Sequence, residues 1–245
     1  MTRIASIFLL IPALAAAIQD TPIATDRPGF SDGSNVVGKG ISQAEFGFFR
    51  TQVGGSAFWS AGDLLLRYGV SDDLELRLIG LSYGFATGGT DDWLDPSVGF
   101  KYRFQRGGDG RPELTFVGQT TIPVGTSPLR SNSVNPTAKL AWTMPYGPGT
   151  VGGNLVFARF GSSGARFNQA ALSLFYGQSL SPRFAITGEA WVVDRIGPGL
   201  DGAGYGSLAG TYLLDLNTQI DLRIGSGFNE SRDGWFLQGG LSVRF

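Results

Sequence analysis

The charged side chains are the residues through which this chain could do chemistry, because two common catalytic residue types are absent from its sequence. The 245 residues include no histidine and no cysteine. The usual general base, the commonest metal ligand and every thiolate nucleophile are therefore missing. Lys and Arg number 19 and Asp and Glu number 20, so no basic excess is available to bind nucleic-acid phosphates. We expect no enzyme activity, no cofactor and no nucleic-acid partner.

Two kinds of short motif do not change this expectation. Residues 147–152 and 197–202 both match the spacing of a phosphate-binding glycine loop, but neither follows a parallel strand and opens a helix. We interpret both as turns, because a chain with 38 glycines produces such matches easily. Asp91, Asp92 and Asp95 form a carboxylate cluster whose oxygens are of the type that binds Ca²⁺. We interpret this cluster as a solvated loop and predict no metal site.

The charged residues alternate with apolar ones, and this pattern indicates the elements that position them. Leu74, Leu76 and Leu78 share one face of an extended segment, while Glu75 and Arg77 share the other. Similar runs are separated by Gly, Pro, Asn and Asp, as strands are separated by turns. Residues 150–160 alternate poorly, so the boundaries of that run are the least secure. The twelve runs lie at approximately residues 41–51, 61–70, 74–83, 94–104, 112–123, 135–144, 150–160, 167–179, 183–194, 204–214, 218–228 and 234–245.

The gaps between the runs favour a membrane barrel over a soluble sandwich, although both have one apolar and one polar strand face. Short gaps, such as residues 71–73 and 180–182, alternate with longer ones at 84–93, 124–134 and 195–203. Outer-membrane barrels have short periplasmic turns at one end and longer extracellular loops at the other. We therefore predict an all-β fold, a transmembrane antiparallel up-and-down β-barrel of about 12 strands over residues 40–245.

The N-terminal region is predicted to hold two different segments. Residues 1–17 have a cationic start, an apolar run too short to span a bilayer and a final triplet of alanines, which is typical of a cleaved signal peptide. Residues 18–39 are rich in Pro, Gly, Asp and Ser, so they cannot join the sheet for long. This segment either enters the lumen as a plug, with Asp26, Arg27 and Pro28 as candidate plug residues, or forms a loose periplasmic leader.

A family resemblance rests on several segments, most of them in the first half of the chain. They are TDRPGFSD at 25–32, VVGKG at 36–40, QAEFGF at 43–48, LLLRYGVSDDLELR at 64–77, GFKYRF at 99–104 and IPVG at 122–125. In these residues the chain resembles the MetA-pathway of phenol degradation family of envelope proteins, strongly over residues 25–125 and in pattern beyond. The resemblance implies a Gram-negative outer-membrane barrel that acts as a channel or transporter. It also favours the plug interpretation, because the family pattern is densest there.

If the barrel closes, residue parity places most charged strand residues inside it. A lipid-facing Arg or Lys at the membrane midplane costs about 2–4 kcal/mol, so these charges require a wet or internally paired interior. One interpretation is a pore-lining ladder that sets selectivity, and the other is a packed, nearly closed core. Because the acids and bases nearly balance, we predict weak ion selectivity at most. The predicted pore-lining residues are Glu45, Asp63, Arg67, Glu75, Arg77, Asp95, Lys101, Arg103, Lys139, Glu189, Asp221, Arg223 and Arg244.

These observations predict an outer-membrane channel or transporter that passes small solutes, including hydrophobic or aromatic compounds, through a polar lumen. The alternative is an occluded structural or adhesive outer-membrane barrel without transport activity. The expected partners are the lipid bilayer, lipopolysaccharide, the barrel-insertion machinery and a small-molecule solute. The terminal Phe245 resembles the assembly signal that the insertion machinery reads. The expected location is the bacterial outer membrane, reached by means of the cleaved signal peptide.

Overall fold

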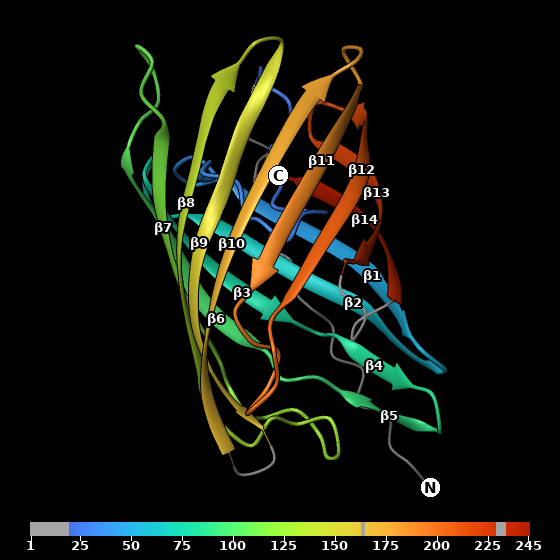
Figure 1. Cartoon of the computed structure of the whole chain (residues 1–245). Coiled ribbons are helices and arrows are strands. Elements are labelled where there is room, and N and C mark those ends of the chain that lie inside the picture. Colours follow the sequence, from blue (N-terminus) through green and yellow to red (C-terminus); the bar gives the residue numbers. More distant parts are fainter. Residues whose placement is uncertain (1–19, 163–164, 229–233) are drawn as a thin grey trace, which may run out of the picture.

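The computed structural model describes residues 20–162, 165–228 and 234–245, and Figure 1 shows them as a sheet rolled around a central space. The signal peptide expected over residues 1–17 lies outside the described residues. No helix among the described residues is long and apolar enough to cross a membrane. The strands are β1 (Ser42–Val53), β2 (Ser56–Gly69), β3 (Leu74–Gly80), β4 (Tyr83–Ala86), β5 (Thr90–Trp93), β6 (Ser97–Gln105), β7 (Glu113–Thr121), β8 (Asn135–Tyr146), β9 (Gly149–Ser162), β10 (Ala165–Ser179), β11 (Phe184–Val193), β12 (Ala203–Asp215), β13 (Thr218–Gly227) and β14 (Gly234–Arg244).

The sheet is closed, because β1 pairs antiparallel with β2 on one side and with β14 on the other. Every other pairing joins strands antiparallel, and β3 pairs directly with β6. The wall of the barrel therefore consists of 12 strands, with β4 and β5 as a hairpin attached to one end of β2. The predicted antiparallel barrel of about 12 strands is confirmed.

The β4–β5 hairpin corrects one expectation, because residues 84–93 were predicted to form a loop. The chain leaves β3 through Leu81, whose φ of 52° is in the left-handed region, and then pairs again with the first half of β2. Each strand of the hairpin has only four residues, and the intervening turn contains Gly88 and Gly89. Such short pieces rich in Gly, Thr and Asp carry no alternation that sequence inspection could detect.

The two faces of the wall have opposite polarity, with charges inside and apolar side chains outside. In β3, Glu75 and Arg77 are buried, whereas Leu76 and Leu78 are 51% and 44% exposed. The same alternation recurs in β13, where Asp221 and Arg223 are buried. The outward apolar side chains form a band around the barrel that includes Phe100, Tyr102, Phe116, Leu140, Leu155, Phe157, Leu172, Leu174, Leu208, Leu222, Ile224 and Leu241.

Strand β9 shows why its sequence alternates poorly. Gly152, Gly153 and Asn154 are all buried, so buried and exposed residues do not alternate over these three positions. The glycines bring the backbone close to its neighbours: a Cβ on Gly153 would lie 2.1 Å from the carbonyl oxygen of Ser173. Alternation begins only at Leu155, which is exposed, and Val156, which is buried.

The longest connections, at residues 81–96, 122–134 and 194–202, lie at one end of the barrel, as the gap lengths predicted, although Gly54 and Gly55 alone join β1 to β2 at that same end. The end with the short turns also holds the junction of β1 with the carboxyl terminus, where Ser42 and Phe245 exchange two backbone hydrogen bonds of 2.9 Å. The other end holds the β4–β5 hairpin, at the bottom of Figure 1. Residues 20–41 precede β1 and lie inside the barrel rather than beside it, since their partners are inward-facing side chains of the wall.

Candidate functional site: a charged lumen filled by the N-terminal segment

Residues 20–40, called the N-terminal segment below, enter the barrel at the short-turn end and return to it. The backbone N–H of Ile23 donates to the carbonyl of Leu216 (2.7 Å), and that of Gly40 donates to the carbonyl of Gly69 (2.8 Å). Between these two points the segment reaches Glu189, near the middle of β11. The segment therefore forms a loop inside the half of the barrel that lies nearer the short turns.

Asp26 is the centre of the most deeply buried ion-pair group. Lys101 Nζ lies 2.8 Å from both carboxylate oxygens of Asp26, and Arg77 Nη1 lies 3.0 Å from Oδ2. Arg67 lies 3.7 Å from the same oxygen and is held by Glu75, which accepts two hydrogen bonds of 2.9 Å from its guanidinium. All these side chains are buried. The segment thus supplies the carboxylate that neutralises cations on β2, β3 and β6.

Two wall carboxylates hold the backbone of the segment. Glu45 accepts hydrogen bonds from the consecutive N–H groups of Asp26 and Arg27, at 3.1 and 3.0 Å to Oε2. Glu189 accepts from Phe30 and Ser31 in the same manner, at 2.8 and 2.7 Å. Consecutive backbone N–H groups that point to one anion form a favourable anion site. Each glutamate therefore fixes the path of the segment and not only one side chain.

Asp32 is tied to the wall by both its side chain and its backbone. Its carboxylate accepts hydrogen bonds from Arg77 (3.0 Å) and from Lys139. Its backbone N–H donates to Asn154 Oδ1 (2.8 Å), and its carbonyl accepts from Asn154 Nδ2 (2.9 Å). This arrangement satisfies a fully buried asparagine and joins the tip of the segment to β3, β8 and β9.

Arg27 lies on a part of the wall that has no side chains. Its guanidinium covers Gly47 and Gly240, which face each other across β1 and β14; a Cβ on Gly47 would lie 2.2 Å from Arg27 Nη2. From this position Nη2 donates to the carbonyl of Gly239 (2.8 Å), and Nε lies 3.5 Å from Asp221. The two glycines therefore provide the space that the guanidinium occupies.

An aromatic stack holds the tip of the segment. The ring of Phe30 is parallel to that of Trp191, with 5.1 Å between their centroids, and Trp191 stacks in turn on Tyr205 at 5.2 Å. Arg223 lies 4.8 Å from the Trp191 ring and donates to Glu189 at 2.6 Å. Arg223 therefore makes both a cation–π contact with Trp191 and an ion pair with Glu189. Phe30 covers an aromatic surface that would otherwise face the lumen.

Several residues predicted to line the pore lie outside this network. Asp63 accepts a hydrogen bond from Ser60 Oγ at 2.8 Å and forms no hydrogen bond or ion pair with residues 20–40, while Asp95 accepts from the backbone of the β7–β8 connection. Arg103 pairs with Asp73 and Glu113 at the short-turn end. Arg244 donates to the carbonyl of Thr21 at 2.7 Å and so contacts the start of the segment. The other nine predicted residues, with Asp26 and Arg27, lie together in the interior, and Pro28 is buried among them.

The structure also brings in residues that the sequence did not single out. Asp32 and Asn154 are the main ones, and Ser31 and Ser173 join them through hydroxyl groups 2.6 Å apart. Asp32 is part of the family-like run at 25–32, which was the available signal. Asn154 could have been found as a lone amide in a run of glycine and apolar residues.

The interior charges are balanced once the segment is included. The wall provides four carboxylates, Glu45, Glu75, Glu189 and Asp221, and five cations, Arg67, Arg77, Lys101, Lys139 and Arg223. The segment adds Asp26, Asp32 and Arg27, which makes six charges of each sign. Within the described residues, no group of three or more His, Cys, Asp or Glu could hold a metal ion. The arrangement therefore pairs charges and fills the interior of the barrel.

A small cavity remains beside the segment. It has a volume of about 250 Å³ and lies between residues 23–33 and the inner faces of β10 to β13. Thr187, Ser207, Thr211 and Gln219 give it a polar wall. At ~30 Å³ per water molecule, it could hold several waters or one small organic molecule.

Comparisons with known proteins agree with this architecture. A family model described as Putative MetA-pathway of phenol degradation matches residues 25–245. The KdgM porin in complex with disordered oligogalacturonate aligns with a TM-score of 0.57 and 11% identity, over 83% of this chain and 99% of that chain. Another KdgM porin structure gives 0.55 and 12%, over 82% and 99%. The CymD monoaromatic hydrocarbon channel aligns at 0.44 and 10%, over 85% and 88%. No curated protein matches.

Proposed function

This chain belongs to the MetA-pathway of phenol degradation family, and we propose that it is an outer-membrane channel for small solutes whose lumen is closed by its N-terminal segment. The observation that carries the proposal is the occupation of the barrel interior by residues 20–40, which are bound to the wall by Asp26, Arg27 and Asp32. The family match extends the resemblance seen in residues 25–125 over the rest of the barrel.

A location in the outer membrane is supported by the polarity of the two barrel faces. Leucine, isoleucine and phenylalanine side chains are exposed on the outside, where water would leave them unfavourably solvated and lipid would not. The charges are inside, where they avoid the cost of about 2–4 kcal/mol for an Arg or Lys at the lipid midplane. The KdgM porins share the closed barrel fold.

Passage of a solute requires either the cavity beside the segment or displacement of the segment. The cavity of about 250 Å³ limits the first route to small molecules, and its hydroxyl and amide lining favours uncharged polar ones. Displacement would uncover the ring of Trp191, on which Phe30 now stacks and which itself stacks on Tyr205. An open lumen would then present an aromatic surface beside charged groups, which suits small aromatic solutes.

The second candidate is an occluded structural barrel without transport. The specific observation in its favour is the burial of Asp26 within 3.0 Å of both Lys101 and Arg77, because separating paired charges in a buried site is costly. This candidate makes the same structural claim about closure and differs only in whether the segment moves.

Planar-bilayer recording distinguishes the two candidates. The mature chain and a variant lacking residues 18–36 are refolded from detergent, and folding of each is verified before recording. We expect rare, small openings from the intact chain and large, stable openings from the deletion variant, because deletion empties the short-turn half of the lumen. A folded deletion variant that conducts no better than the intact chain would contradict closure by the segment.

A further inference from the structure

The outer face of the barrel carries two arginines that the lumen does not use. Arg159 on β9 and Arg166 on β10 are exposed, and both lie in the long-loop half of their strands. Neither side chain forms an ion pair or a hydrogen bond within the described part of the chain. By contrast, Arg195 nearby is paired with Asp194 at 3.2 Å. Two unpaired cations on a lipid-facing wall are unexpected unless a ligand neutralises them.

The strand register places Arg159 one outward position, and Arg166 two outward positions, beyond an apolar strip. Phe100, Gly118, Ala138, Phe157 and Ala170 are successive partners across β6 to β10 and form one outward row. The adjacent row toward the long loops contains Val98, Thr120, Pro136, Arg159 and Asn168, and Arg166 lies one outward position beyond Asn168. On β9 and β10 the surface therefore changes from apolar to polar and cationic within two outward positions.

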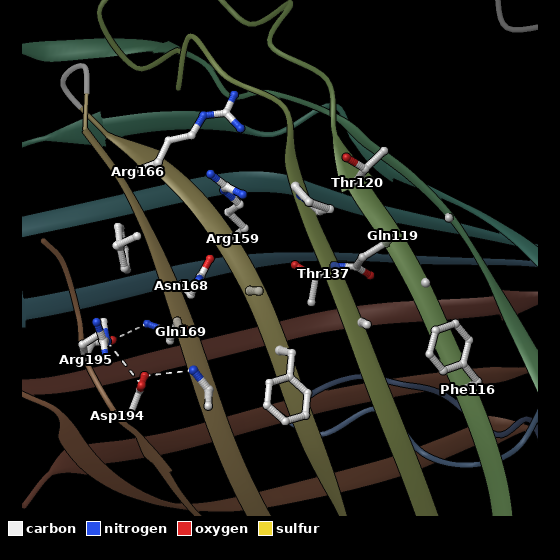
Figure 2. Close-up of a pocket in the computed structure, with 18 of the residues that line it drawn as sticks. Phe116, Gln119, Thr120, Thr137, Arg159, Arg166, Asn168, Gln169, Asp194 and Arg195 are labelled. Atoms are coloured by element: carbon white, nitrogen blue, oxygen red, sulfur yellow. Dashed lines mark hydrogen bonds and ion pairs between the residues drawn. The ribbon is translucent and has the colours of Figure 1, made fainter.

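The two rows line a groove on the outside of the wall, which Figure 2 shows. Its volume is about 1360 Å³, larger than the ~300–1,000 Å³ of pockets for drug-sized molecules. Arg159 and Arg166 extend into its upper part, and the ring of Phe116 projects from the wall in its lower part. The groove thus offers two cations above an apolar floor.

We propose that this groove binds lipopolysaccharide of the outer leaflet, with its phosphates on Arg159 and Arg166 and an acyl chain along Gly118 and Ala138. Arginine binds phosphate through paired N–H donors, and basic pockets at the membrane interface recognise lipid headgroups. The long-loop end of an outer-membrane barrel faces the leaflet that contains this phosphorylated glycolipid. The inference rests on the outer-membrane location in the proposed function, but not on conduction.

Binding is measured on the full mature chain in mild detergent by titration with purified lipopolysaccharide and by counting bound molecules with native mass spectrometry. We expect Arg159→Ala and Arg166→Ala each to weaken binding about tenfold, since each removes a charge-assisted contact to phosphate. Arg183→Ala is the matched control, because Arg183 is an exposed arginine at the short-turn end and should leave binding unchanged.

Two further ligands separate the lipid sources. Phosphatidylglycerol tests a single phosphate on an ordinary phospholipid, and dephosphorylated lipid A tests the acyl chains alone. The proposal would be overturned if either ligand bound as tightly as lipopolysaccharide. It would also be overturned if both arginine variants bound lipopolysaccharide with unchanged affinity. Conductance of the same preparations is a separate readout: a silent barrel that still binds lipopolysaccharide would contradict the channel and leave this site standing.

Discussion

Asp26 is the residue on which closure depends most. Its carboxylate lies within 3.0 Å of Lys101 and Arg77, and all three side chains are buried. Removing one partner from a buried ion pair leaves the other charge without compensation, which is far more costly than losing a surface pair.

Asp26→Asn tests this dependence with almost no change in shape. We expect the variant to lose ~3–5 kcal/mol of unfolding free energy, because Lys101 remains buried without its carboxylate. Urea unfolding of the refolded barrel measures the change. Asp63→Asn is the control, since the carboxylate of Asp63 bonds to Ser60 rather than to the segment. Equal unfolding midpoints for the two variants would argue against the assigned role of Asp26.

Gly47 gives a second prediction at the scale of one residue. In Gly47→Ala the new Cβ would occupy the position of the Arg27 guanidinium, so Arg27 must leave Asp221. We expect more frequent channel openings than in the unmodified chain, and we expect the same of Arg27→Ala. Gly188→Ala is the control, because a Cβ there would meet nothing within 4 Å. If Gly47→Ala and Gly188→Ala gave the same opening frequency, the position of Arg27 would not matter for closure.

Residue parity predicted which charges face inward, because a strand places alternate side chains on opposite faces. It could not predict which of them meet. Asp95 has inward parity near the end of its run, yet it bonds the backbone of residues 125 and 131, because the wall is interrupted there by Pro96 and the β4–β5 hairpin. Asn154 was missed because two preceding glycines hide the alternation around it.

At the scale of elements, the N-terminal segment occupies the lumen without forming a regular helix or strand. Its backbone N–H groups at residues 26, 27, 30 and 31 are satisfied by the carboxylates of Glu45 and Glu189 instead of by a regular ladder. The segment therefore depends on the wall for its structure. The sequence suggested this location only as one of two alternatives, because Pro and Gly exclude regular structure without indicating where the chain goes.

The β4–β5 hairpin gives a prediction about the wall. Because β3 pairs directly with β6 through residues 74–79 and 97–102, the barrel is closed without the hairpin. In the test variant a short glycine turn replaces residues 84–92, and we expect this variant to fold. On a gel it should migrate as a compact, folded band before heating and as the slower unfolded chain after heating. A deletion of equal length within β7 should abolish the compact band. Loss of that band in the hairpin variant would show that the hairpin is part of the closed wall.

At the scale of the whole molecule, charge balance sets the expected selectivity. Without the segment, the wall network retains four carboxylates and five cations, so neither sign dominates. We expect the variant lacking residues 18–36 to show a reversal potential near zero in a salt gradient. A reversal potential close to the equilibrium potential of either the cation or the anion would contradict a mixed-charge lumen.

The number of wall strands and the positions of the longest connections could be predicted because they follow from alternation and turn residues, which are local properties. Closure of the lumen could not be, because it depends on contacts between residues far apart in the chain, such as Arg27 with Asp221 and Asp32 with Lys139. Composition shows only that opposite charges are present in similar numbers.

The central claim is that the N-terminal segment closes the lumen, and a reversible covalent bond tests it most directly. Ser31 and Ser173 have hydroxyl groups 2.6 Å apart in the interior, and the chain contains no other cysteine to interfere with a Ser31→Cys, Ser173→Cys pair. The measurement is single-channel conductance of this pair in the Asp26→Asn background, first oxidised and then reduced. We predict openings after reduction and silence after oxidation. Equal conductance in both states, with the disulfide verified by mass, would contradict closure by the segment.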